Sequence, residues 1–188
     1  SDYMVVEENS GDELGFAMSS AGDVDGDGLD DILLGAYGND DAGPSAGITY
    51  LLLGSSFGDE RTLPLGDASY RITGAYAHDS SGHSVAEAGD VDGDGLSDGL
   101  IGAYQNTDGG IRTGAAYLLF GSSFGDDQDL DLYLDADYQL MGVDDYDSVG
   151  YSVSGAGDVD GDGLDDVVVG STSLKTSEGV TVGGVYIF

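Results

Sequence analysis

One phrase of eight residues, Gly-Asp-Val-Asp-Gly-Asp-Gly-Leu, occurs three times in this chain of 188 residues. The copies are Gly22–Leu29, Gly89–Leu96 and Gly157–Leu164, so the repeat has a period of 67 and then 68 residues. In each copy a glycine lies eight positions before the first aspartate and another lies twelve positions after it. Such a period indicates an array of similar structural units. We therefore predict a single repeat array over residues 1–188, with units at about 1–69, 70–137 and 138–188.

Each unit is predicted to contain four short β-strands. In the first unit these lie at Tyr3–Val6, Phe16–Ser20, Asp31–Ala36 and Ile48–Leu53. The third strand is an almost continuous apolar run, which is typical of a strand covered on both faces. No segment shows a helical period, so the fold class is all-β. Radial stacking of four-stranded sheets buries such units, and we predict the blades of a β-propeller.

The repeated phrase has the residue types and spacing of a calcium loop. Carboxylates at alternate positions point inward as the chain wraps a cation, and a glycine permits the turn that brings a backbone carbonyl to the same ion. Each loop therefore predicts four Asp side chains and one Leu carbonyl as ligands. The predicted ligands are Asp23, Asp25, Asp27, Leu29 and Asp31 in the first loop, Asp90, Asp92, Asp94, Leu96 and Asp98 in the second, and Asp158, Asp160, Asp162, Leu164 and Asp166 in the third.

All of these ligands are hard oxygen atoms, which favours Ca2+ over zinc and copper and over the small octahedral shell of Mg2+. Leu34, Ile101 and Val169 occupy the position at which a helical EF-hand places its bidentate glutamate, so the loops are not EF-hands. The alternative for a single loop is a solvated Asp-Gly turn. Three copies in one frame favour three Ca2+ sites.

The net charge is extreme, with four Lys and Arg residues against 37 Asp and Glu residues, which gives −33. Such a surface repels nucleic acid and anionic lipid. Its self-repulsion is weakened by salt, because the Debye length is only about 3 Å at 1 M. We therefore expect a halophilic source; the alternative is a functional field that recruits cations or a basic partner. No apolar run approaches 18 residues, so we expect no membrane insertion.

The chain resembles the FG-GAP repeats of the integrin α-chain β-propeller and of related bacterial and archaeal surface proteins. The Phe-Gly of that family corresponds to Leu14-Gly15, Ser81-Gly82 and Val149-Gly150, while Gly-Ala-Pro corresponds to Gly35-Ala36-Tyr37, Gly102-Ala103-Tyr104 and Gly170-Ser171-Thr172. The glycines match, whereas Phe and Pro are replaced. The resemblance implies structural Ca2+ in the hairpin between the first two strands of each blade.

Three blades cannot close a ring, so the array needs a further element. We predict that the N-terminal strand, Tyr3–Val6, completes the C-terminal blade of another chain by main-chain pairing. A twofold pair would then form a ring of six blades, and a rotation that does not close would form a filament. The alternative is a fragment of a larger, seven-bladed propeller.

The predicted function is that of a non-enzymatic module. No Ser or Cys nucleophile is placed with a His and an acid in a recognisable arrangement, and His78 and His83 are interpreted as surface or loop residues. We expect an extracellular or cell-surface location and a role in adhesion or as a subunit of a surface assembly, with a protein or glycan ligand. The alternative function is a lectin-like module or an appendage of a secreted polysaccharide-degrading enzyme.

Overall fold

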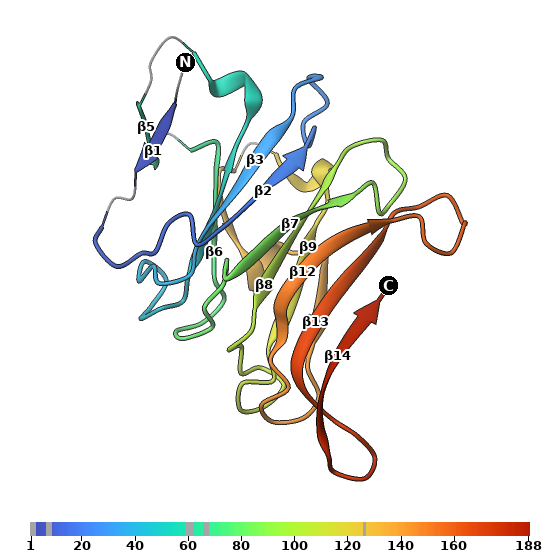
Figure 1. Cartoon of the computed structure of the whole chain (residues 1–188). Coiled ribbons are helices and arrows are strands. Elements are labelled where there is room, and N and C mark those ends of the chain that lie inside the picture. The colour runs from blue at the N-terminus through green and yellow to red at the C-terminus, as the bar shows by residue number, and fades with distance from the viewer. Residues whose placement is uncertain (1–2, 7–8, 59–61, 66–67, 126) are drawn as a thin grey trace.

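The computed structural model describes residues 3–6, 9–58, 62–65, 68–125 and 127–188. Its strands form successive sheets that follow one another across the molecule from the N-terminus to the C-terminus (Figure 1). The innermost strand of each sheet lies against that of the next, with β2 (Ala17–Gly22) beside β7 (Ser84–Gly89) and β7 beside β12 (Val149–Gly157). This all-β arrangement is that of β-propeller blades, as predicted.

The first sheet is antiparallel over its first four strands and has a fifth, parallel strand at its outer edge. Its order from the inside outward is β2, β3 (Asp31–Ala36), β4 (Ile48–Leu52), β6 (Tyr70–Thr73) and β10 (Asp129–Asp131). The last strand comes from the following repeat unit. The second unit therefore reaches back and extends the sheet of the first.

The second and third sheets repeat this plan with fewer strands among the described residues. The second sheet consists of β7, β8 (Asp98–Ala103), β9 (Ala115–Leu119) and β11 (Tyr138–Met141). The third sheet consists of β12, β13 (Asp166–Lys175) and β14 (Thr181–Ile187). A single turn of helix, α1 (Leu132–Asp135), precedes β11, and no helix in the described part of the chain is long and apolar enough to cross a membrane.

The sheets are out of phase with the sequence units, because the boundaries near residues 70 and 138 fall immediately before β6 and β11. The fourth strand of each complete sheet thus belongs to the next sequence unit. The equivalent strand at the N-terminus, β1 (Met4–Val6), does not join the first sheet; it pairs in parallel with β5 (Thr62–Pro64). Met4 pairs with Thr62 just as Arg71 pairs with Asp129, so the β1–β5 ribbon has the register of β6 and β10.

The core lies between the sheets. Leu33, Leu51, Ile101 and Leu119 are at most 1% exposed in the cluster between the first and second sheets. The sheets approach closely where the repeated glycines meet, because the space beside the Cα of Gly35 is filled by the carbonyl of Gly82. Gly35 and Gly82, like Gly102 and Gly150, are therefore contact points between neighbouring sheets.

Candidate metal centres

The three acidic loops connect the two innermost strands of each sheet, β2 to β3, β7 to β8 and β12 to β13. In each loop three carboxylates offer oxygen atoms that lie within 4.8 Å of one another. The groups are Asp23, Asp25 and Asp27 in the first loop, Asp90, Asp92 and Asp94 in the second, and Asp158, Asp160 and Asp166 in the third. Nine of the fifteen predicted ligands belong to these groups, and Asp162 lies in the third loop outside its group.

Hydrogen bonds to the loop backbone hold the first carboxylate of each loop in place. Asp23 accepts from the amides of Gly26 and Gly28, at 2.8 and 2.9 Å, and Asp90 and Asp158 accept the equivalent pairs of glycine amides. The glycines Gly26 and Gly28 have φ values of 75° and 88°, which L-residues with side chains rarely adopt. The sequence Asp-Gly-Asp-Gly therefore folds the loop around its own carboxylates.

The predicted closing ligands differ between the loops. Asp31 and Asp98 are buried beneath the first two groups rather than within them, and their carboxylates accept amide hydrogens from Val24 and Gly54, and from Val91 and Gly121. Burial, and to a smaller extent the nearby carboxylates, raise the pKa of Asp98 to about 6. In the third loop Asp166 is a member of the group. The Leu29, Leu96 and Leu164 carbonyls remain predicted ligands.

Backbone hydrogen bonds link each loop to the next. The amide of Ser97 donates to the carbonyl of Asp23 at 3.0 Å, and the amide of Asp165 donates to the carbonyl of Asp90 at 3.1 Å. The Asp165 carboxylate also accepts from the Asp90 amide, at 3.0 Å. Because Asp23 and Asp90 are the first residues of their groups, the geometry of one loop depends on the sheet that follows it. The sequence analysis did not identify this role of Ser97 and Asp165.

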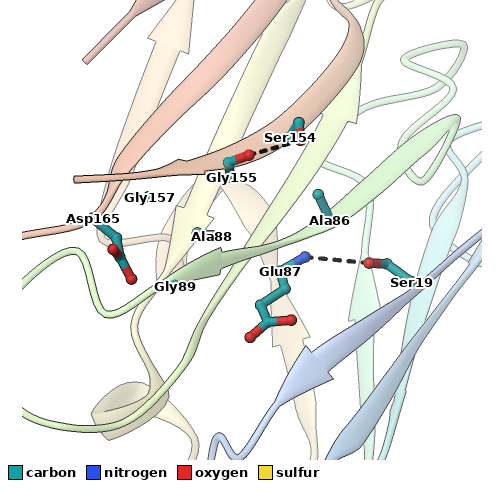
Figure 2. Close-up of a pocket in the computed structure, with 9 residues that line it drawn as sticks. All are labelled: Ser19, Ala86, Glu87, Ala88, Gly89, Ser154, Gly155, Gly157 and Asp165. Atoms are coloured by element: carbon teal, nitrogen blue, oxygen red, sulfur yellow. Dashed lines mark hydrogen bonds between the residues drawn. The ribbon is translucent and has the colours of Figure 1, made fainter. Parts of the chain in front are cut away.

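A hollow of about 340 Å³ lies between the innermost strands, next to the loops (Figure 2). Its charged side chains are Glu87 and Asp165, and the Glu87 amide donates to the hydroxyl of Ser19 across the gap between β7 and β2, at 3.4 Å. The remaining lining residues are small. The hollow adds further negative charge beside the acidic loops.

An aromatic cluster surrounds His83 at the opposite end of the innermost strands. The imidazole ring lies 4.4 Å from the ring of Tyr104 and 5.0 Å from the rings of Phe16 and Tyr151, measured between centroids. Burial lowers the pKa of His83. The interpretation of His83 as a surface or loop residue was therefore incomplete, because the side chain is half-buried at a meeting point of three sheets. The sequence feature that could have indicated this burial is the position of His83 directly after a repeated glycine.

A second feature that the sequence analysis missed is a buried aspartate in each unit. Asp12, Asp79 and Asp147 are at most 6% exposed, and each lies eleven residues before the first aspartate of its loop. The carboxylate of Asp79 accepts hydrogen bonds from the Asn106 side chain at 3.0 Å and from the Tyr76 amide at 3.1 Å. Burial raises the pKa of Asp79 to about 6. These aspartates fasten the loops at the end of the sheets away from the metal groups.

The raised pKa of Asp79 predicts a pH-dependent stability. Because the folded-state pKa lies above the ordinary value of 3.8, the stabilisation is fully present below pH 3.8 and is lost as the pH rises through about 6. The Asp79→Asn variant avoids this loss. We expect its free energy of unfolding, relative to that of the wild type, to increase by about 2 to 3 kcal/mol between pH 4 and pH 7. Urea denaturation at each pH measures the difference, and a pH-independent difference would contradict the prediction. Asp127→Asn, at an exposed site, is the matched control.

Comparison with known proteins agrees with this geometry. The FG-GAP repeat family matches residues 16–52 and 149–188, which span the first and third acidic loops. The chain contains FG-GAP repeats. Four of the FG-GAP glycines, Gly35, Gly82, Gly102 and Gly150, lie where neighbouring sheets meet, and the acidic loops lie between the first two strands of each FG-GAP blade. The resemblance seen in the sequence is thus confirmed.

Similar FG-GAP proteins include two integrin α chains. The chain is 29% identical to integrin alpha-PS2 of Drosophila melanogaster over 91% of its length, and 31% identical to integrin alpha pat-2 of Caenorhabditis briggsae over 95%. It is also 32% identical to phosphatidylinositol-glycan-specific phospholipase D of Bos taurus over 84% of its length. These matches span only 12%, 15% and 18% of the respective relatives.

Proposed function

We propose that the chain is a calcium-binding FG-GAP module of a cell-surface or extracellular protein, active in adhesion or as a subunit of a surface assembly. The observation that carries the proposal is the recurrence of three clustered carboxylates at the same place in three sheets. Like charges this close repel one another, so the groups favour a bound cation. In the part of the chain that the structure describes, Arg71 forms ion pairs with Asp41 and Asp129, which lie outside the loops.

Calcium fits these groups because every side-chain donor is a carboxylate oxygen, the ligand type that hard cations prefer. Each loop joins two strands and is hydrogen-bonded to the next sheet, so a bound ion would stabilise the contact between sheets. We propose a structural role for three Ca2+ ions, with dissociation constants of about 10⁻⁴ to 10⁻³ M, as in other extracellular modules. We further propose that the module has no enzymatic activity of its own.

Completion of the third sheet by a second chain is the second part of the proposal. The β1–β5 ribbon reproduces the register of β6 and β10, which form the two outer strands of the first sheet. Tyr50 on β4 pairs with Arg71 on β6. The equivalent pair would join Tyr186 on β14 to Met4 of another copy. The ribbon would then extend the third sheet from three strands to five, in the order found in the first sheet.

A closed pair of chains or a filament would follow from such strand pairing, according to the rotation between copies. The high negative charge supports a halophilic source, in which salt screens repulsion between chains. The alternative is that the three blades belong to a larger propeller, lectin-like or appended to a secreted enzyme. The chain is similar to short stretches of much longer relatives, and this similarity supports the alternative as well as it supports the proposed assembly.

Light scattering in high salt tests the assembly. We expect a dimer or polymer in calcium and a shift to monomer in EDTA. Val5→Pro is expected to leave a monomer, because it removes an amide hydrogen that pairing with β14 would use. On β6 the Arg71 amide faces β10, so the amides of the two neighbouring residues face β4. Val5 is equivalent to Ile72, so its amide would face β14. Val5→Thr keeps this amide and should assemble. A folded monomer in calcium for the wild type would support the larger-propeller alternative.

A further inference from the structure

An apolar groove lies between the second and third sheets, beside β11. It has a volume of about 440 Å³, and its walls include Val91, Leu118, Leu140, Leu164 and Phe188. A smaller hollow of about 240 Å³ shares Leu140 and Phe188 and extends along the same strand. Among the described residues, β11 is the outer strand of its sheet, so an open strand edge borders the groove. We call this feature the open groove.

The equivalent groove between the first and second sheets is filled. A covering segment, residues 124–125 and 127–132, supplies Phe124, Leu130 and Leu132 to the cluster that contains Val24 and Ile72. Leu130 and Leu132 are 8% and 0% exposed. In this segment β10 pairs in parallel with β6, the amide of Arg71 donates to the carbonyl of Gln128 at 2.7 Å, and the Tyr70 hydroxyl donates to the carbonyl of Gly125 at 2.9 Å.

A second covering segment shows that this arrangement is repeated. It comprises residues 57–58 and 62–65; within it β5 pairs in parallel with β1, and Leu65 is 1% exposed in the cluster that it forms with Ile48 and Leu52. The ring of Phe57 lies 5.1 Å from that of Tyr3, as the ring of Phe124 does from that of Tyr70. Both segments carry Phe followed by Leu six and eight residues later. The chain therefore contains two examples of a covering segment that carries a Phe and two Leu residues and fills a groove of this type.

The open groove has the same walls without a cover. Tyr138 is equivalent to Tyr70 and Tyr3, and its side chain is 59% exposed. Ile72 and Val24 are 0% and 1% exposed in the filled groove, whereas the equivalent Leu140 and Val91 are partly exposed. Burying partly exposed apolar side chains of this kind stabilises a complex, and the strand edge of β11 offers main-chain hydrogen bonds in addition.

We propose that the open groove is a docking site for an extended segment of another polypeptide, which carries Phe and then Leu six and eight residues later and pairs in parallel with β11. The Phe ring would lie against Tyr138, the two Leu side chains would enter the groove, and the Gln139 amide would bond to the peptide backbone as the Arg71 amide does in the filled groove. This site is separate from the β14 edge, so it does not depend on the proposed exchange of β1.

A synthetic peptide of residues 122–134 is the probe, because it contains the covering segment of this chain. We expect saturable binding of one labelled peptide to each full-length, calcium-loaded chain, measured by fluorescence anisotropy in high salt, which screens the repulsion between acidic molecules. The peptide with Leu130→Asp and Leu132→Asp should bind roughly tenfold more weakly or worse, since it cannot bury the two Leu side chains. Equal binding of the two peptides, or no binding of the first, would overturn the proposal.

Two further measurements locate the peptide. Tyr138→Ala is expected to weaken binding, whereas Tyr133→Ala, at a similarly exposed tyrosine on α1, should not. Hydrogen exchange should show added protection at the Gln139 amide. Protection on β14 instead would mean that the peptide acts as the missing fourth strand of the third sheet, which would reject the open groove while leaving the proposed chain pairing intact.

Discussion

Replacement of Asp25, Asp92 and Asp160 together by Ala is expected to reduce the number of calcium ions bound per chain from three to none, as counted by isothermal titration calorimetry. Each residue is the middle carboxylate of its group. Removing it leaves the ion without a central ligand, while the strands on either side keep their hydrogen bonds. The variant should therefore fold without calcium as the wild type does, but should gain no stability when calcium is added.

The loss of stability can be estimated from mass action. At about 10 mM Ca2+ and a dissociation constant of 10⁻⁴ to 10⁻³ M, each site contributes about 1.4 to 2.7 kcal/mol to the free energy of unfolding. The control variant replaces the exposed Asp108, Asp127 and Glu178 by Ala, which removes the same charge from outside the loops. It should still bind three ions. Unchanged stoichiometry in the triple loop variant would show that the ions bind elsewhere.

The sequence predicted the parts of the fold that depend on local pattern. Three of the four strands of the first unit lie within about a residue of their expected bounds, because apolar runs and Asp-Gly turns delimit them. Gly35, Gly82, Gly102 and Gly150 keep one frame because neighbouring sheets meet at these positions. The first two acidic groups followed from spacing, since residues two apart in a tight loop turn toward a common centre, whereas the third group contains Asp166 in place of Asp162.

The parts that could not be predicted depend on contacts between units. The covering strands β5 and β10 contain three residues each, too few to show an alternating pattern, and each pairs with the first strand of its own sequence unit, which lies far away along the chain. The spacing of the aspartates in the sequence likewise did not predict that Asp31 and Asp98 are buried beneath the acidic groups. The burial of Asp79 could have been suspected, because an aspartate recurs at that position in all three units.

Gly150→Ala is expected to cause one of the largest losses of stability among single substitutions. A methyl group at this position would overlap the carbonyl oxygen of Ala115, and the φ of 78° is unfavourable for alanine. The carbonyl of Gly150 also fills the space beside Gly102, so the second and third sheets are in close contact here and would have to separate to make room for the methyl group. Overpacking and backbone strain together should lower the free energy of unfolding by about 2 to 4 kcal/mol.

Gly179→Ala separates the two causes. Its φ is 76°, close to that of Gly150, but no atom lies within 4 Å of the position that a methyl group would take. It should cost only about 1 kcal/mol, the strain of the left-handed conformation. Urea denaturation in calcium measures both variants. If the two losses were equal, the close approach of the sheets at Gly150 would contribute nothing, and the repeated glycine would be needed for backbone conformation alone. A larger loss for Gly150→Ala would instead show that the FG-GAP glycine sets the distance between neighbouring blades, at the end of the innermost strands away from the acidic loops.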